Sequence, residues 1–327
     1  MKTFWKVFIV SFIFFIIAIS LGSYSYLKAN EEKSDSSIDD SIVRKQYKDN
    51  EREELKKVYH SLSEAYDKSD RINIIILGME DIRTDTIIFA SFEPDTKKIN
   101  VISVPRDTYI HRKGYSRAEQ RKINAIYGEH GVEGVRKAVS HIFQGVPIHH
   151  YIMLDYKGVE KVVDSIGGVE VVVPFHMKYD DPTADPPLHI DLKKGKRVLN
   201  GKKALEFLRY RTGNSEENGY IDGDLGRIKA QQQFLKSFTD KVLSYRLPMV
   251  IKDGYQYVET DITLIDALNY SRKALGMKSE DISFSTLPGE SKFRRYDGKL
   301  LSYYIFDSVE IKNILEETYN IEKTPND

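Results

Sequence analysis

The sequence of 327 residues contains no cysteine, and its 49 basic and 49 acidic residues leave a formal net charge of +0. The absence of cysteine excludes disulfides, thiolate catalysis and cysteine-ligated zinc. The balanced charge, with a sequence pI of about 7.1, argues against a general polyanion-binding surface, so nucleic acid is not expected as a partner. A chain of this length can form one large domain or two small ones.

The sequence also lacks the motifs of several large enzyme classes. It contains no Gly-x-Ser-x-Gly elbow, no Walker loop and no His-Glu-x-x-His pair. His149 and His150 are adjacent, but no third ligand at metal spacing follows them, which favours a structural or surface role. A covalent nucleophile is therefore not indicated.

A long hydrophobic run is present at the N-terminus. No charged residue occurs from Val7 to Leu27, and the length of this run matches the ~20 residues that a membrane-spanning helix needs. Lys2 and Lys6 precede the run, and the positive-inside rule then places residues 1–6 in the cytoplasm and the rest of the chain outside. A cleaved signal peptide is the alternative, but no Ala-x-Ala type site follows. We therefore expect an uncleaved, single-pass anchor at 7–27 in the cell membrane.

Residues 28–70 are rich in Lys, Glu, Asp and Ser and contain neither Gly nor Pro. Several apolar residues nevertheless recur at helical spacing, namely Leu55, Val58, Tyr59, Leu62 and Tyr66. This spacing predicts an amphipathic helix over Glu51 to Asp67. We interpret the segment as an extracytoplasmic tether that leads to a domain beginning at Arg71. The alternative is a helix that packs on that domain.

From Arg71 onward, short apolar strands alternate with helical segments. Strands are expected at 72–78, 86–92 and 99–104, with a turn at 93–96 that makes the last two an antiparallel hairpin. Further strands are expected at 169–173 and 282–287, and helices at 131–143, 159–166, 202–208, 227–243, 264–275 and 309–319. This alternation predicts an α/β fold, layered α-β-α around a mixed central sheet, over residues 71–327.

Arginine, aspartate and glutamine recur in three short clusters. They are Arg83–Thr86, Ser103–Thr108, and Arg209–Arg211 together with Asp224–Arg227 and Gln231. Guanidinium groups suit phosphate oxygens, and carboxylates can hold a divalent metal against the same phosphates. The signals for this site fall at the ends of predicted strands and at the starts of predicted helices, where ligands usually bind in open α/β sheets. Together they indicate a site for a phosphate ester, carried on a lipid because the chain is anchored.

Carboxylates flank the loop between the first two predicted strands. Glu80 or Asp81 follows the first strand, and Asp85 is expected just before the second. Two carboxylates around one loop can share a Mg²⁺ ion, which takes oxygen ligands and retains some water. The alternative is a set of turn residues that cap the strands.

The third cluster begins a predicted helix. At 100° per residue, Asp224, Arg227 and Gln231 share one face with the apolar residues further along. Polar side chains at the inward-facing start of a helix are unfavourable unless paired, and a phosphate there would meet free N–H groups and the helix dipole. The alternative is that Asp224 caps the helix and pairs with Arg227. Arg209 and Arg211 lie upstream, and the loop that follows them is a candidate lid.

The order of these motifs resembles the LytR-CpsA-Psr family of Gram-positive bacteria. In that family an anchor is followed by Arg-x-Asp-Thr, Ser-x-Pro-Arg-Asp-Thr, Lys-x-Asn-Ala, Asp-x-x-Gly-Gly-Val, Ala-Leu-x-x-x-Arg-x-Arg and Asp-x-x-Arg-x-x-x-Gln. In this sequence the motifs are Arg83–Thr86, Ser103–Thr108, Lys122–Ala125, Asp164–Val169, Ala204–Arg211 and Asp224–Gln231. The resemblance runs from about Arg71 to at least Leu243.

The resemblance implies an extracytoplasmic phosphotransferase. Such an enzyme moves a glycopolymer, wall teichoic acid or another anionic polysaccharide, from polyprenyl pyrophosphate to a hydroxyl of peptidoglycan. The residues implied to hold the pyrophosphate are Arg106, Lys122, Arg209, Arg211, Arg227 and Gln231. Asp85 is implied to bind Mg²⁺, and Asp224 to hold the arginines or assist proton transfer. Arg106, Asp224 and Arg227 are therefore the implied catalytic residues.

One departure from the family pattern concerns the metal. Relatives usually carry Gly-x-Asp after the first strand, whereas this chain has Glu80 at that position and Asp81 next to it. Either residue is a candidate for the second metal ligand. Two other functions stay open, namely a polyprenyl-pyrophosphate hydrolase and a non-catalytic binder or scaffold for lipid-linked glycans. A transcription regulator conflicts with the external placement of the domain.

Overall fold

The computed structural model describes residues 57–322, except 81, 184–186, 215–218, 222–223 and 244–246. Of Glu80, Asp224, Leu225, Ile228 and Met249 only the backbone is described. Within these ranges, no helix is long and apolar enough to cross a membrane. The predicted anchor at 7–27 and the predicted tether up to residue 56 lie outside the described residues.

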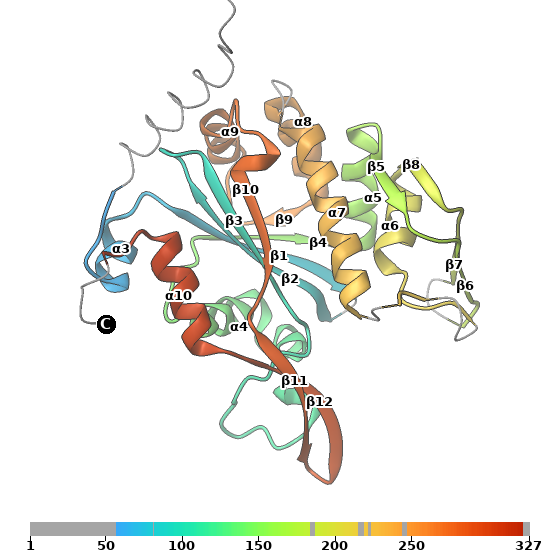
Figure 1. Ribbon diagram of the computed structural model, residues 1–327, viewed down its shortest axis with the longest axis horizontal. Coiled ribbons are helices and arrows are strands. Elements are labelled where there is room, and N and C mark those ends of the chain that lie inside the picture. The colour runs from blue at the N-terminus through green and yellow to red at the C-terminus, as the bar shows by residue number, and fades with distance from the viewer. Residues whose placement is uncertain are drawn as a thin grey trace, which may run out of the picture. The chain divides into compact units, whose positions relative to one another are not determined.

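A six-stranded mixed sheet is the centre of the fold (Figure 1). Its strands, in spatial order, are β10 (Ile282–Thr286), β3 (Lys98–Val104), β2 (Arg83–Glu93), β1 (Ile72–Glu80), β4 (His150–Leu154) and β9 (Glu259–Thr260). β1, β2 and β3 pair antiparallel, whereas β4 is parallel to β1 and β10 is parallel to β3. As a result β1, β3, β4 and β10 run in one direction, and their carboxyl ends lie at a common edge of the sheet.

Alternating side chains of the sheet fill cores on both of its faces. One face contributes Ile75, Leu77, Ile87, Phe89, Ile102 and Val104, which pack with α4 (Tyr127–Ile142) and α10 (Ser308–Thr318). The other face contributes Ile72, Phe92, Ile99 and Val101, which pack with the segments that follow α7 (Asp224–Val242) and α9 (Leu264–Lys273). Figure 1 shows the helices on the two sides of the sheet, together with α8 (Leu247–Gly254). The predicted α/β fold with a mixed central sheet is confirmed.

A second core lies in the segment between residues 156 and 242. It is formed by α5 (Tyr156–Ser165), α6 (Gly201–Arg209), α7 and two hairpin-like pairs of strands. The pairs are β5 (Val169–Val173) with β8 (Gly195–Leu199), and β6 (Met177–Asp181) with β7 (Leu188–Leu192). The strand predicted at 169–173 is present, but it pairs with β8 rather than joining the central sheet.

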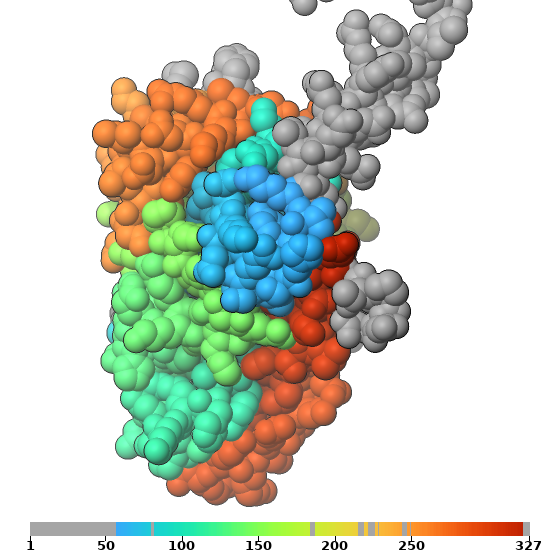
Figure 2. Space-filling view, turned by 90° about the vertical axis from the view of Figure 1, so that its left-hand side faces the viewer, coloured from blue at the N-terminus to red at the C-terminus, as the bar shows by residue number. Residues whose placement is uncertain are grey.

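The first described residues pack on the domain. Tyr59 is buried and its backbone N–H donates to Asn320 O over 3.2 Å, so residues 57–60 are extended rather than helical. The Ser61 hydroxyl then accepts from Glu64 N and begins α3 (Leu62–Lys68), where Ala65 is fully buried. Figure 2 shows this blue segment against the red C-terminal segment. The helix predicted from Glu51 is thus wrong between 57 and 61, and the described part packs on the domain, as in the alternative interpretation.

The C-terminal segment contributes to both the sheet and the core. β10 joins the central sheet, and α10 packs on the face that it shares with α4. Between them, β11 (Gly289–Tyr296) and β12 (Lys299–Phe306) form an antiparallel hairpin that projects from the sheet (Figure 1). This hairpin was not predicted from the sequence, because β11 is rich in charged residues and almost wholly exposed.

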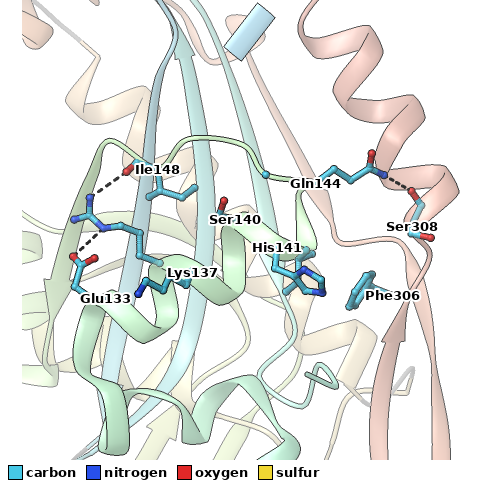
Figure 3. A pocket seen from close by; sticks show the side chains of 11 residues that line it. Glu133, Lys137, Ser140, His141, Gln144, Ile148, Phe306 and Ser308 are labelled. Carbon is cyan, nitrogen blue, oxygen red and sulfur yellow. Dashed lines mark hydrogen bonds and ion pairs between the residues drawn. The ribbon is translucent and has the colours of Figure 1, made fainter. Parts of the chain in front are cut away.

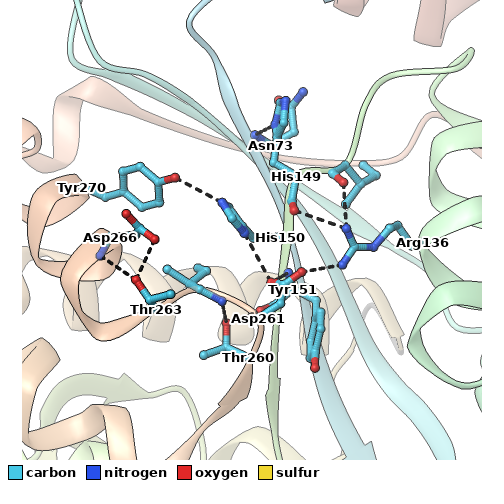
Figure 4. A network of polar contacts seen from close by, with 12 residues as sticks. Asn73, Arg136, His149, His150, Tyr151, Thr260, Asp261, Thr263, Asp266 and Tyr270 are labelled. Carbon is cyan, nitrogen blue, oxygen red and sulfur yellow. Dashed lines mark hydrogen bonds and ion pairs between the residues drawn. The ribbon is translucent and has the colours of Figure 1, made fainter.

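A polar network closes the sheet edge where β1 and β4 begin (Figure 4). His149 Nδ1 accepts from Asn73 N over 2.9 Å, and the neighbouring His150 Nε2 lies 3.1 Å from Tyr270 OH. Asp261, just after β9, accepts from Arg136 Nη2 over 2.7 Å and from Tyr151 N over 3.0 Å. The predicted structural role of the two histidines is therefore confirmed, at the edge opposite the carboxyl ends of the strands.

Candidate active site

The position of Asp85 depends on a bulge in β2. Gly78 pairs with Thr86 and Met79 pairs with Thr84, so Asp85 is an extra residue without a partner on β1. Bulges of this kind re-aim side chains next to active sites. Asp85 therefore lies within β2, which begins at Arg83, and the prediction that it precedes the strand is wrong because the β1–β2 ladder continues beyond it.

Gly78 makes this bulge possible. A Cβ atom on Gly78 would come within 2.9 Å of the Cβ atom of Thr86, a distance that real Cβ atoms do not adopt. The glycine at the end of the apolar run is therefore required by the close approach of two strands, and not only by the end of a strand. It lets β1 approach β2 closely on one side of the bulge.

Arg106 and Asp85 form an ion pair at the carboxyl edge. Arg106 Nη1 lies 2.9 Å from Asp85 Oδ2, and the two side chains are 27% and 23% exposed. Pro105 ends β3, and its carbonyl oxygen accepts from Thr108 N over 2.9 Å, so a tight turn presents Arg106. Because both groups are half-buried and reachable, the pair can open toward an anionic ligand.

Lys122 joins this cluster through the next loop. Lys122 Nζ donates to Asp107 Oδ1 over 2.7 Å, and Asn124 N donates to Arg106 O over 3.2 Å. Lys122 itself lies between two short 3-10 helices, Glu119–Arg121 and Ile123–Ala125. The structure thus pairs Asp85 with Arg106, and pairs Lys122 with Asp107, the residue that follows Arg106. The sequence reasoning gave no role to Asp107, although its place in the Pro-Arg-Asp-Thr motif was a usable signal.

The third cluster reaches the same edge from the side of β4. Arg209 ends α6, and its guanidinium carbon lies 4.2 Å from the ring centre of Tyr156. Tyr156 begins α5 two residues after the carboxyl end of β4, and Leu154 of β4 pairs with Gly78 of β1. The contact with Tyr156 is tertiary, and no sequence signal predicted it.

The start of α7 lies beside α6. Gln231 Nε2 donates to Leu208 O over 3.4 Å, and Arg227 is half-buried one turn earlier. Phe234 is buried further along the same face, as the predicted stripe requires. Arg211 is exposed, and Asp224 is the first residue of α7, with only its backbone described. The helix predicted to begin near Asp224 is confirmed.

Tyr220 is a site neighbour that sequence reasoning missed. Its ring packs edge-on against Phe175, with ring centres 5.2 Å apart, and fills the space beside Gly226, where a Cβ atom would lie 2.5 Å from Tyr220 Cβ. Burial raises the pKa of Tyr220 to about 12. Its buried hydroxyl has no hydrogen-bond partner among the described residues. Gly226 and Tyr220 together fix how the chain enters α7.

Among the described side chains, that of Asp85 is a candidate ligand for a magnesium ion. No group of three His, Asp or Glu side chains within the described part of the chain could hold a metal. Mg²⁺, however, is often bound by one or two carboxylates, water and substrate phosphates. Asp85 is a candidate for one such carboxylate, and it lies beside the guanidinium of Arg106. The side chain of Glu80 and the whole of Asp81 lie outside the described residues, so both remain candidate ligands.

Two cavities open on the surface of the domain. One, of about 570 Å³, is lined by residues from the start of β2, the 3-10 helices, the start of α4 and the β11–β12 tip. The other, of about 880 Å³, lies between α4 and the start of α10, and Figure 3 shows His141 and Phe306 within it. The second cavity is lined by none of the predicted site residues.

Comparisons with known proteins agree with this arrangement. The model of the LytR_cpsA_psr family matches residues 26–320. The polyisoprenyl-teichoic acid–peptidoglycan teichoic acid transferase TagV of Bacillus subtilis is 28% identical over 238 residues, which are 69% of this chain and 59% of that protein. The corresponding transferase TagU of Oceanobacillus iheyensis is 31% identical over 195 residues, 56% and 55% of the two chains. The chain thus spans less than two thirds of the length of these two relatives.

Other relatives extend the comparison. The regulatory protein MsrR of Staphylococcus aureus is 28% identical over 244 residues, 72% of this chain and 69% of that protein. The crystal structure of B. subtilis TagV superposes with a TM-score of 0.63 at 26% identity, covering 78% of this chain and all of that one. A structure of TagT bound to LI-WTA has a TM-score of 0.57 at 21% identity, over 77% and 91% of the chains, which shows a shared fold.

Proposed function

Because the chain belongs to the LytR_cpsA_psr family, we propose that it is a phosphotransferase that moves a glycopolymer from polyprenyl pyrophosphate to peptidoglycan. Two relatives carry the name of polyisoprenyl-teichoic acid–peptidoglycan teichoic acid transferases, which supports this reaction class. The polymer is wall teichoic acid or another anionic polysaccharide, and the acceptor is a hydroxyl of peptidoglycan.

The observation that carries the proposal is the Asp85–Arg106 pair, followed along the chain by the Asp107–Lys122 pair. Two ion pairs, of 2.9 Å and 2.7 Å, hold a guanidinium and an ammonium group at the carboxyl edge of four strands. The carboxylates hold these cations at the sheet edge before the ligand arrives, which preorganises the site for a diphosphate, and the pairs open when it binds. This arrangement suits P–O bond cleavage, in which catalysis depends mainly on positioning and charge neutralisation.

In the proposed reaction, the pyrophosphate is bound on one side by Arg106 and Lys122. On the other side it is bound by Arg209, Arg211, Arg227 and Gln231. The peptidoglycan hydroxyl attacks the phosphorus that carries the sugar, a new P–O bond forms, and polyprenyl phosphate leaves with the electrons of the broken bond. Asp224 holds the arginines or accepts the proton of the attacking hydroxyl. The cationic groups stabilise the charge that develops on the phosphoryl oxygens.

Magnesium is part of the proposal. Asp85, with Glu80 or Asp81, would hold Mg²⁺ against the pyrophosphate, where the ion would neutralise charge on the phosphate oxygens. The carboxylate of Asp85 would then exchange its contact with Arg106 for one with the ion, which frees the guanidinium for the substrate.

The proposed location is the outer face of the cell membrane. The charge-free run at 7–27 and the lysines before it support a single anchor with a cytoplasmic N-terminus. An anchored enzyme meets a lipid-linked donor in the plane of the same membrane. Its soluble domain then faces the wall.

Product analysis distinguishes this function from its alternatives. The full chain in detergent micelles is incubated with labelled polyprenyl-pyrophosphate glycan, Mg²⁺ and peptidoglycan. We expect the label on peptidoglycan through a phosphodiester. Label released as soluble glycan phosphate, equally with and without acceptor, would indicate a hydrolase. Tight donor binding with no product would indicate a binder or scaffold.

A further inference from the structure

The β11–β12 hairpin projects from the domain and has no role in the reaction described above (Figure 1). Its strands have eight residues each, and Asp297 and Gly298 connect them with φ angles of 48° and 73°. Two central residues with positive φ are typical of the type I′ turn, which joins antiparallel strands tightly. The hairpin is therefore a regular element that ends in a tight turn.

One face of the hairpin packs on the loop that follows Arg106. Tyr303 is fully buried, and its hydroxyl donates to Ala118 O over 2.8 Å. Tyr296, on the same face, stacks on Tyr109 with ring centres 5.8 Å apart. These contacts fix the direction in which the hairpin projects.

Backbone hydrogen bonds fix the base of the hairpin beside the proposed site. Tyr304 N donates to Asp107 O over 3.0 Å, and Tyr109 N donates to Tyr304 O over 2.9 Å. Asp107 directly follows Arg106 in the chain. The turn that presents Arg106 therefore lies at the base of the hairpin.

The opposite face of the hairpin carries apolar side chains in contact with solvent near the tip. Phe293 and Leu300 are 73% and 54% exposed. Arg295 lies directly opposite Leu300 in the ladder and two residues along β11 from Phe293, so the three side chains share one face. The only acidic residue of the two strands, Glu290, alternates to the other face.

Cations outnumber carboxylates around the tip. Three exposed cations there form no ion pair with any other described residue, namely Arg294 and Arg295 of β11 and Arg117, which lines the same cavity as Asp297. Glu290 is paired with Lys292 over 2.6 Å. Asp297 in the turn is thus the one carboxylate of the hairpin that offsets these arginines. The net positive charge attracts a negatively charged surface.

We propose that Phe293, Arg295 and Leu300 form a docking surface for an anionic lipid bilayer. Apolar side chains beside arginines suit the bilayer interface, where the apolar groups enter the acyl boundary and the cations meet lipid phosphates. Three side chains are too few for a stable protein–protein interface, which takes about 20–30 residues on each side. They suffice at a bilayer to which the chain is already tethered, because tethering gives a high effective concentration.

Docking fixes the orientation of the domain on the membrane. Because the turn that presents Arg106 lies at the base of the hairpin, this contact keeps the turn close to the leaflet that carries a lipid-linked donor. The inference rests on the proposed anchor at 7–27 and is independent of whether the chain catalyses transfer.

A single tryptophan at the tip reports the contact. Trp5 is the only tryptophan of the chain, so Phe293→Trp in a Trp5→Phe background carries one indole. The full chain is reconstituted into vesicles of phosphatidylglycerol and phosphatidylcholine, with plain or brominated acyl chains. Bromine quenches an indole that touches the acyl chains, and we expect it to lower the fluorescence at least about twofold.

A second reporter and two charge reversals are the controls. Ile265→Trp in the same background should be unaffected by bromine, because Ile265 is 72% exposed on α9, at the far end of the domain from the hairpin (Figure 1). Arg295→Glu, or vesicles of phosphatidylcholine alone, should remove most of the quenching at position 293. Lys161→Glu, at an exposed cation on α5, should leave it unchanged.

The outcomes separate the docking surface from the anchor and from the reaction. Quenching that is absent at position 293, or equal at positions 293 and 265, would overturn the docking surface. An indole at 293 that is shielded from aqueous acrylamide but not quenched by bromine would overturn it in favour of contact between copies of the chain. Failure of the chain to float with the vesicles would contradict the anchor and the contact that depends on it. Absence of transfer with quenching intact would contradict the proposed function alone.

Discussion

A single extra residue in β2 determines where the site's carboxylate lies. Asp85 has no partner across the ladder because the register shifts between Gly78 and Met79. Its side chain is therefore free of the regular alternation of the strand and meets Arg106 instead. The sequence identified both residues of the pair, but the bulge that joins them depends on a contact between two backbones.

Gly78→Ala tests the bulge at the level of one methyl group. The new Cβ atom would lie 2.9 Å from Thr86 Cβ, so the strands must separate, at a cost of about 1–3 kcal/mol in the free energy of unfolding. Urea denaturation measures this loss. Gly254→Ala is the control, because its Cβ atom would have ordinary contact with Val162 at 3.9 Å. Equal stability of both variants would show that the bulge tolerates a side chain.

At the scale of elements, the first described segment acts as part of the domain. Tyr59, Ala65 and Tyr66 pack on the core that α4 and α10 share with the sheet, and the ring of Tyr66 lies edge-on to Tyr319 with centres 5.2 Å apart. The polar composition of residues 28–70 concealed this, since only a few apolar residues carry the contact. A flexible tether and a segment packed on the domain therefore have nearly the same composition, and only these few apolar residues distinguish them.

Two truncated fragments should therefore differ in their free energy of unfolding. A fragment that begins at Arg71 loses Tyr59, Ala65 and Tyr66, and we expect it to be less stable by about 3 kcal/mol or more than one that begins at Lys57. Urea denaturation followed by circular dichroism gives the difference. Indistinguishable transitions would mean that the contacts with Tyr319 and Asn320, just after α10, contribute nothing to stability.

The junction of β1 and β4 should make stability depend on pH. Burial, with the nearby charges of His150 and Arg136, lowers the pKa of His149, whose Nδ1 must stay unprotonated to accept from Asn73 N. As the pH falls, the unfolded chain therefore binds a proton at His149 at a higher pH than the folded chain does. Stability is fully present above the unfolded pKa of about 6.5 and falls as the pH drops toward the lower folded pKa.

His149→Asn isolates this effect, because an amide oxygen replaces the acceptor and cannot be protonated. Thermal unfolding at pH 7.5 and 5.5 should show a smaller loss of Tm for this variant than for the parent. His111→Asn, at an exposed histidine, should leave the parent's loss unchanged. An identical pH dependence in all three proteins would contradict the account of His149.

Elements were predictable where one periodicity dominates. The apolar runs of β1, β2 and β3 and the helical spacing of α5, α6 and α10 were recognised because each buries a continuous face. β6, β7 and β8 were missed, since each has only five residues and pairs only with one of the others or with β5. Strands of this kind acquire their structure from the core beneath them, which local sequence does not reveal.

At the scale of the whole molecule, the site forms where separate segments end at one sheet edge. β1, β2 and β3 supply Asp85 and Arg106, the loop before α4 supplies Lys122, and the second core supplies Arg209 and Gln231. The motifs indicated these residues as candidates because phosphate chemistry restricts the residue types. The partners of these residues, such as Asp107 with Lys122, follow from tertiary structure and were not predicted.

The central claim is that the Asp85–Arg106 pair carries phosphoryl transfer, and turnover of the full chain tests it most directly. Transfer of labelled glycan to peptidoglycan is measured for the parent, Arg106→Ala, Asp85→Ala and the control Arg272→Ala, an exposed arginine on α9. We predict Mg²⁺-dependent transfer by the parent and the control, and a loss of about 10²–10³-fold in each site variant. Transfer by Arg106→Ala and Asp85→Ala at the parental rate would contradict the account.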